Sequence, residues 1–210
     1  KQEEIILEIR HLRKRYGREK NRVEAVSDIS LQLSRGQILG IVGESGSGKS
    51  TLLRQIACLE RADEGTLLLN GKEITGKKTR DICGQLQMIF QNASRSFDPR
   101  RKISASIDEM LRAHTKLRGM RLRERREELI RMVGLQPELA DRYPSRLSGG
   151  QCQRMAIARA LAAEPEVLLC DEITSALDMS AQAQIVGVLD TLRRQMHLSV
   201  IFVSHDLALT

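Results

Sequence analysis

An eight-residue glycine-rich motif constrains this chain more than any other feature of its sequence. Gly43-Glu44-Ser45-Gly46-Ser47-Gly48-Lys49-Ser50 matches the pattern G-x-x-x-x-G-K-[ST] and directly follows the apolar run Ile38–Val42. Apolar residues at helical spacing come next, at Leu52, Leu53, Ile56 and Leu59. Glycines let the backbone approach a ligand closely, and N–H groups at a helix N-terminus attract anions. The motif therefore predicts a strand–loop–helix unit that cradles the phosphates of a nucleotide.

Each chemical group of this loop has an expected role. The backbone from Gly43 through Thr51 is expected to line the nucleotide. We expect Lys49 to neutralise charge on the β- and γ-phosphates, and to be exposed when no ligand is bound, while the Ser50 hydroxyl binds Mg²⁺. The alternative interpretation is a glycine-rich turn that binds nothing. The strand and the helix on either side argue against it.

A pair of acidic residues follows a second apolar run. Val167 to Cys170 are apolar, and Asp171-Glu172 come next. Because open parallel sheets bind ligands at the carboxyl ends of their strands, Asp171 suits a partner of Mg²⁺. Glu172 suits the group that orients and polarises an attacking water. Alone, two acids after a strand often only begin a helix. Together with the glycine motif they predict hydrolysis of a nucleoside triphosphate.

The stretch Leu147-Ser148-Gly149-Gly150-Gln151 narrows the class of protein further. Locally it predicts a helix start, with Ser148 as N-cap and Gln151 completing a capping box. Gly149 and Gly150 would leave N–H groups bare for an anion, so a phosphate-binding role is also physically sensible. In a chain that carries the other two motifs, in this order, the stretch resembles the signature of the ABC (ATP-binding cassette) family.

The resemblance covers essentially the whole chain and implies further site residues. Gln91, after the apolar segment 86–90, stands where the family has a glutamine that serves the metal and catalysis. Ser175 to Asp178 resembles the family's D-loop, and Ser204-His205-Asp206 resembles its switch-histidine loop, which makes His205 a catalytic candidate. Tyr16 stands where the family has an aromatic residue that stacks on adenine. Each of these residues alone is more often structural.

Hydrophobic patterns and the resemblance together predict the fold class. Alternation at Ile5, Leu7 and Ile9, and again between residues 29 and 33, predicts half-buried strands. Asn70-Gly71 predicts a hairpin turn, and the short apolar runs predict buried parallel strands. Residues 104–133 are helical in pattern. We expect an α/β P-loop NTPase core with a mixed or parallel sheet, an N-terminal antiparallel β-subdomain and a helical insertion subdomain. One ABC ATPase domain over 1–210 divides into 1–91, 92–145 and 146–210.

The family also implies a function and partners. Two such domains would face each other head to tail, as a homo- or heterodimer, with ATP and Mg²⁺ between the phosphate loop of one and the signature of the other. Transmembrane permease subunits would dock at the Gln91 loop and the helical insertion. The expected activity is ATP hydrolysis by the motor subunit of a bacterial importer. Its expected place is the cytoplasmic face of the inner membrane, as a peripheral protein.

One branch of the family fits best, with departures. Residues 92–101 resemble the segment found in oligopeptide, dipeptide and nickel importers, although Phe97 and Asp98 depart from that branch's pattern. Ile173 replaces the proline that usually follows the acid pair, but both acids remain. Family members continue beyond the position of Thr210, so we expect the chain to be truncated relative to them.

Composition and spacing limit the alternatives. No run approaches the roughly 18 to 20 apolar residues of a membrane span. The net charge of +7 invites a nucleic-acid partner, but aromatic residues make up only 2%, which disfavours base stacking, and a basic surface near anionic lipid explains the excess equally well. ABC ATPases of DNA repair with long coiled coils insert hundreds of residues between the phosphate loop and the signature. In this chain Leu147 follows Ser50 by only 97 positions, which argues against that class. A subunit of a phosphonate-metabolism (carbon–phosphorus lyase) complex stays open as an alternative to an importer.

Overall fold

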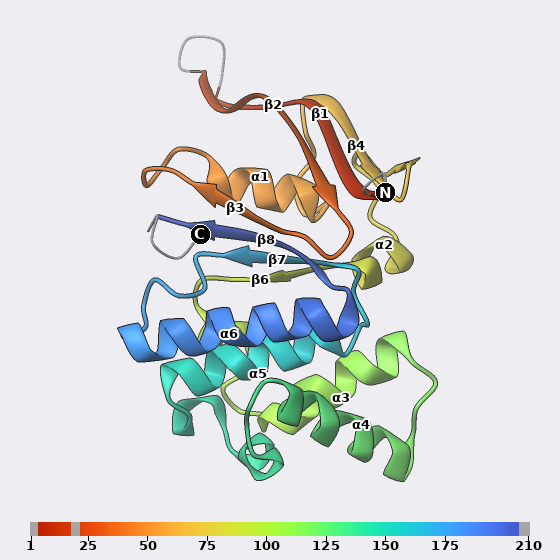
Figure 1. Cartoon of the computed structure of the whole chain (residues 1–210), viewed down its shortest axis with the longest axis vertical. Helices are drawn as coiled ribbons and strands as arrows, with labels where there is room; N and C mark the ends of the chain where they lie inside the picture. The colour runs from red at the N-terminus through yellow and green to blue at the C-terminus, as the bar shows by residue number, and fades with distance from the viewer. Residues whose placement is uncertain (1–3, 18–21, 206–210) are drawn as a thin grey trace.

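The chain folds into layers around two four-stranded sheets (Figure 1). The computed structural model describes residues 4–17 and 22–205. The antiparallel sheet has the order β2-β1-β4-β5, and the parallel sheet has the order β3-β8-β7-β6. Helix α1 (Lys49–Ile56) lies between the sheets, and the four longest of the other helices lie on the far face of the parallel sheet. The α/β fold class expected from the sequence is confirmed.

The antiparallel sheet is built on two long strands, β1 (Ile5–Tyr16) and β2 (Val23–Ser34), with β4 (Glu64–Leu69) and β5 (Lys72–Glu73) beside them. Asn70 and Gly71 connect β4 to β5 with φ of 50° and 71°. Positive φ at both positions is the type I′ hairpin turn, so the predicted hairpin is confirmed. The predicted alternation fails at Ile5, which is exposed while Ile6 is buried. Register shifts between β1 and β2 break the period of two there.

The parallel sheet carries the ends that form the candidate site. Its strands are β3 (Ile38–Val42), β8 (Ser199–Ser204), β7 (Val167–Asp171) and β6 (Leu86–Ile89), and every neighbouring pair is parallel. Because the strands run in one direction, the segments that follow them meet at one edge of the sheet. Figure 1 shows the arrowheads of β3, β7 and β8 on the same side.

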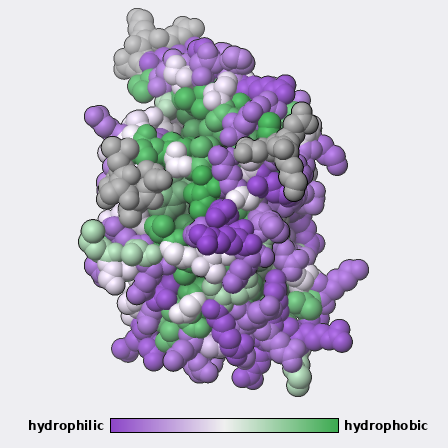
Figure 2. Space-filling model, viewed as in Figure 1, coloured by the Kyte–Doolittle hydropathy of each residue, from purple (hydrophilic) through white to green (hydrophobic). Residues whose placement is uncertain are grey.

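Burial separates the central strands from the edge. Every residue of β7 and β8 is buried, with alternate side chains packed into the two apolar clusters on opposite faces. This explains their continuous apolar sequence. By contrast β3, at the edge of the sheet among the described residues, has no fully buried residue, and Ile38 is 38% exposed. Figure 2 shows apolar side chains gathered on this face at the level of β3 and β8.

The remaining helices form one apolar cluster against the sheet. It is lined by α5 (Gly149–Leu161), α6 (Met179–Met196), α3 (Ile103–His114) and α4 (Gly119–Met132). The helical pattern over 104–133 is thus two helices, joined by a short turn that ends at Gly119 with φ of 55°. The shorter elements are α2 (Arg80–Gln85) and the 3-10 turns Ala93–Ser96, Pro137–Asp141 and Pro144–Arg146.

Candidate functional site: a phosphate loop with an acidic edge

The glycine-rich loop joins β3 to α1 in a conformation that requires glycine. Gly46 and Gly48 have φ of 81° and 92°. A Cβ built on Gly48 would lie 1.8 Å from the carbonyl oxygen of Ala25 in β2, whereas one on Gly46 would meet open space. The loop is therefore packed against the antiparallel sheet at Gly48. Its remaining turn is free to face a ligand, as the motif predicts.

Lys49 closes the loop on itself. Its Nζ donates to the carbonyl oxygens of Gly43 and Glu44, each at 2.7 Å, and lies 3.8 Å from Oε1 of Glu172. The residue is only 8% exposed, so the expectation of an exposed ammonium was wrong. The two carbonyls and the carboxylate surround the Lys49 ammonium group at the place where a phosphate would bind. They compensate the cost of burying this positive charge.

Ser50 and Asp171 meet at the carboxyl ends of the parallel strands. The Ser50 hydroxyl donates to Oδ1 of Asp171 at 2.9 Å, which brings the start of α1 to the end of β7. Burial raises the pKa of the Asp171 carboxyl, and the Ser50 hydrogen bond opposes that shift. A hydroxyl and a carboxylate are oxygen ligands of the kind that Mg²⁺ prefers. The residues present therefore fit a magnesium ion.

Glu172 lies at the centre of a polar cluster. Its φ is 48°, which is uncommon for a residue other than glycine, and its N–H donates to the carbonyl of Val203 in β8 at 3.1 Å. Its Oε2 accepts a hydrogen bond from Nε2 of Gln91 at 3.2 Å and lies 4.0 Å from Nδ1 of His205. Backbone strain of this kind gathers at functional sites when the surroundings enforce it.

Ser175, the first residue of the stretch that resembles the D-loop, joins the same cluster, although its side chain is not among the predicted site residues. Gln91 Nε2 also donates to the Ser175 hydroxyl at 3.1 Å, and that hydroxyl donates to the Glu172 carbonyl at 2.9 Å. The signal was the i+3 spacing from Glu172, because serine commonly hydrogen-bonds nearby backbone groups in turns. Gln91 further lines a pocket of about 460 Å³ together with Ser50 and Asp171.

Tyr16 lies at the end of β1, beside α1. Its hydroxyl donates to Glu60. Burial is the largest of the causes that raise the pKa of the phenol, whereas Thr51 in the first turn of α1 lowers it. Nζ of Lys14 lies 5.5 Å from the ring centroid. The structure thus brings Tyr16 next to the phosphate-loop helix.

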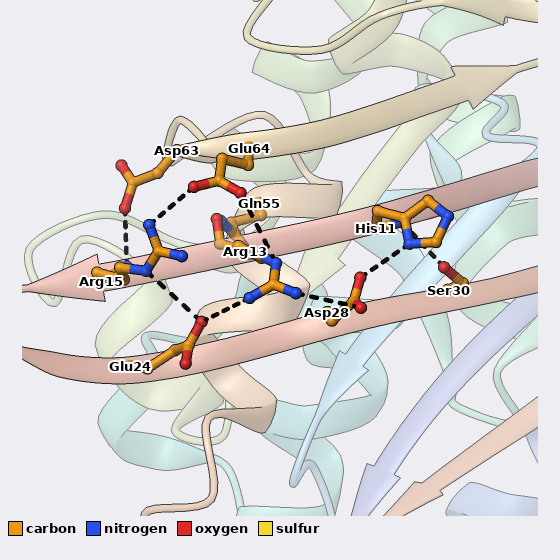
Figure 3. A network of polar contacts seen from close by, with 9 residues as sticks. All are labelled: His11, Arg13, Arg15, Glu24, Asp28, Ser30, Gln55, Asp63 and Glu64. Carbon is orange, nitrogen blue, oxygen red and sulfur yellow. Dashed lines mark hydrogen bonds and ion pairs between the residues drawn. The ribbon is translucent and has the colours of Figure 1, made fainter.

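A network of charged side chains holds this end of β1 (Figure 3). The Arg13 guanidinium contacts carboxylates of Glu24, Asp28 and Glu64 at 3.2 to 3.7 Å, and Arg15 contacts Glu64 at 2.7 Å. Gln55 of α1 reaches up to donate to the carbonyl of Arg13 at 3.4 Å. The network therefore joins β1, β2, β4 and α1 just before Tyr16.

The signature stretch has the predicted helix cap but, among the described residues, makes no polar contact with the phosphate loop. The Ser148 hydroxyl accepts from the N–H of Gln151, and the Gln151 side chain accepts from the N–H of Ser148, which confirms the capping box. Cβ atoms on Gly149 and Gly150 would lie 3.2 and 3.3 Å from Leu177 and Ala181, so packing also favours glycine. Within residues 4–17 and 22–205, no hydrogen bond or ion pair joins Ser148, Gly149, Gly150 or Gln151 to the phosphate loop.

Two further observations concern the switch-histidine loop and membrane-spanning helices. His205 is exposed beside Glu172, and Asp206 lies outside the described residues. Over the described stretches, no helix combines the length and apolar character that crossing a bilayer demands.

A phosphate loop ahead of a buried sheet, with two acids at the neighbouring strand end, defines a P-loop nucleotide-binding protein. The family described as "ABC transporter" matches residues 26–175. The chain belongs to this family. Together with the fold, the match confirms the resemblance drawn from the three motifs.

Relatives and solved structures agree. The chain is 47% identical over 190 residues to the oligopeptide transport ATP-binding protein OppF of Salmonella typhimurium, covering 89% of this chain and 57% of the relative. OppF of Bacillus subtilis is 42% identical over 211 residues, covering 98% and 69%. The ATP-binding cassette MJ0796, solved as a dimer bound to ADP and Pi, superposes with a TM-score of 0.87 at 29% identity, covering 97% of this chain and 90% of that one. The chain thus spans little more than half the length of the first of these relatives.

Proposed function

We propose that this chain is the ATP-binding and ATP-hydrolysing motor of a membrane importer for peptides. The observation that carries the proposal is the convergence of Lys49, the Ser50–Asp171 pair and Glu172 at one edge of the parallel sheet. The names of the relatives, which are oligopeptide and dipeptide transport ATP-binding proteins, support the transport role and the class of cargo.

The proposed chemistry is in-line attack of water on the γ-phosphorus, with cleavage of its bond to the leaving ADP. Lys49 and the loop N–H groups hold the phosphates and neutralise their charge. Glu172 orients the water and accepts its proton, and His205 and Gln91 hold Glu172 and the water in place. Ser50, Asp171 and Gln91 would hold Mg²⁺, which supplies further charge neutralisation on the phosphates. Tyr16 stacks on the adenine ring.

The site needs a second subunit. The signature residues Ser148, Gly149, Gly150 and Gln151 offer the N-terminus of α5 to an anion, and we place them against the ATP held by a facing homologous domain, in a homo- or heterodimer. The dimeric cassette MJ0796 bound to ADP and Pi supports this arrangement.

The permease would meet the segment after Gln91. Arg95 of this segment is exposed, so a permease segment with an acidic side chain would be complementary in charge. Attachment through such a partner would place the protein on the cytoplasmic face of the inner membrane. In this proposal the chain divides into a β and phosphate-loop part (1–91), a permease-sensing insertion (92–145) and a signature half (146–210).

The decisive test is Glu172→Gln in the full-length protein. The substitution keeps the shape but removes the base, so phosphate release should fall by about 10²- to 10⁴-fold. ATP binding should persist, and a long-lived ATP-bound dimer should appear in sizing chromatography. Glu138→Gln, at an exposed glutamate, is the matched control and should behave as wild type.

A second substitution tests the composite site. Adding Ser148→Arg to Glu172→Gln puts bulk and charge between the subunits and should abolish the ATP-dependent dimer. Wild-type turnover in Glu172→Gln would refute the base assignment. A dimer that tolerates Ser148→Arg would refute the signature assignment.

A further inference from the structure

Two short segments of this protein concentrate its positive charge, residues 10–22 and residues 112–126. Residues 112–126 contain seven arginine and lysine side chains and a single acid, Glu124, a net charge of +6. The whole chain carries +7. This second segment comprises the end of α3, the turn after it and most of α4.

Most of these cations are neutralised within the fold, but three are not. Arg123, Arg125 and Arg126 pair with Glu127, Glu128 and Asp108 at 2.7 to 3.0 Å, and Arg112 lies 4.0 Å from Asp108. In the part of the chain that the structure describes, Lys116, Arg118 and Arg121 have no carboxylate within 4.0 Å, and all three are exposed. We call Lys116, Arg118, Met120 and Arg121 the basic turn.

The basic turn is unfavourable for the helix that it begins. Arg118 is the N-cap residue of α4, its side chain makes no cap hydrogen bond, and the first turn of α4 contains no acid. The N-terminus of a helix carries partial positive charge and is stabilised by anions. Cations at this position repel that charge, so an external anion would relieve a repulsion that the chain itself leaves uncompensated.

An apolar side chain projects among these cations. Met120 is 76% exposed, while its neighbours Leu117 and Leu122 turn inward to the core. Figure 1 shows the α3–α4 connection on the side of the molecule opposite to the one where β3, β7 and β8 end. The basic turn is therefore remote from the phosphate loop and is free to contact another surface.

We propose that the basic turn contacts the anionic headgroups of a lipid bilayer, with Met120 at the boundary between headgroups and acyl chains. Cations flanking an exposed apolar side chain match such an interface in both charge and polarity. A nucleic acid fits less well, because aromatic residues make up 2% of the chain and none belongs to the turn. The contact goes beyond the proposed function, since it requires neither permease nor nucleotide.

Vesicle binding of the purified full chain tests the proposal. Vesicles of phosphatidylcholine with phosphatidylglycerol should bind the protein, and pure phosphatidylcholine vesicles should not. One basic residue near an anionic surface strengthens binding about fivefold, so Lys116→Gln/Arg118→Gln/Arg121→Gln should lower the partition coefficient by about 100-fold. Arg61→Gln/Lys72→Gln/Arg142→Gln removes the same charge from exposed, scattered positions and should bind nearly as wild type. Equal loss in both triple variants would overturn the proposal.

A tryptophan reporter locates the contact independently. The chain contains no tryptophan, so Met120→Trp introduces a single fluorophore. Its emission should shift to the blue with anionic vesicles and return at 1 M salt, where the screening length falls to about 3 Å. Met179→Trp, at an 81% exposed methionine, is the control and should not shift. A shift with single-stranded DNA but not with vesicles, or equal shifts at both positions, would refute the lipid contact. Vesicle binding without ATPase activity would refute only the proposed function.

Discussion

Side chains of the phosphate loop are held in place by partners that a bound phosphate must displace. Lys49 is the clearest case, because two loop carbonyls and Glu172 surround its ammonium group. Such charge-assisted contacts keep the side chain ordered and aimed into the loop. Binding of ATP would exchange carbonyl partners for phosphate oxygens without a large movement of the lysine.

Lys49→Ala should remove this exchange. We expect ATP affinity to fall by at least about 100-fold, since two charge-assisted hydrogen bonds of about 1.5 to 3 kcal/mol each are lost. The fold should persist, because the freed carbonyls belong to an exposed loop. Isothermal titration calorimetry measures the change, with Lys72→Ala as the surface control. Unchanged binding in Lys49→Ala would refute nucleotide binding by this loop.

Two glycines of the loop should respond differently to the same substitution. Gly46→Ala adds only left-handed backbone strain, about 1 to 2 kcal/mol, because its Cβ meets open space. Gly48→Ala adds the same strain and a 1.8 Å approach to the carbonyl of Ala25. We therefore expect Gly48→Ala to be far less stable in urea unfolding. Equal unfolding midpoints would show that the loop and β2 are not packed as described.

At the scale of elements, the helical insertion depends on pairing between its two helices. Buried Ile107 and Leu111 of α3 and Leu129 and Ile130 of α4 share one apolar cluster. A polar link reinforces this contact, because Nη1 of Arg126 lies 2.7 Å from both carboxylate oxygens of Asp108. The link joins helices, whereas most other arginines of α4 pair within α4.

Removing the link should cost more than removing a surface pair. The Arg126 side chain is 16% exposed, so Arg126→Ala leaves Asp108 poorly compensated and should lower the free energy of unfolding by about 3 kcal/mol. Arg123, which is 72% exposed and pairs with Glu127, is the control, and Arg123→Ala should cost less than about 1 kcal/mol. Urea unfolding measures both. Similar losses would mean that the Asp108–Arg126 contact is only a surface pair.

At the scale of the whole molecule, strand β3 forms an apolar edge of the parallel sheet within residues 4–17 and 22–205. Strand β3 pairs only with β8 among the described residues, and its apolar side chains are partly exposed (Figure 2). An exposed apolar edge offers unpaired backbone groups to another chain. The same strand leads into the phosphate loop, so its position matters for the site.

Ile38→Lys should reduce self-association through this edge. Lysine on an edge strand opposes edge-to-edge pairing, and Ile38 is far enough exposed to lose little packing energy. Light scattering at rising protein concentration should show a later onset of aggregation, with the unfolding midpoint nearly unchanged. Val200→Lys, in the buried strand β8, should instead unfold the protein. Identical aggregation of wild type and Ile38→Lys would show that self-association does not occur through this edge strand.

The motifs themselves determined the class of fold, the hairpin at Asn70-Gly71, the cap at Ser148 and the candidate residues of the phosphate loop and the acid pair, because turn chemistry, helical spacing and strand–loop–helix order are local properties of a chain. The candidates Tyr16, Gln91 and His205 came from the family resemblance. Only the tertiary structure decided that Lys49 is buried, that Gly48 must pass the Ala25 carbonyl, and that Ser175 completes the Gln91–Glu172 cluster. These depend on distances between segments that lie far apart in the sequence. The same holds for the basic turn, where folding supplies acidic partners to some arginines and leaves Lys116, Arg118 and Arg121 without them.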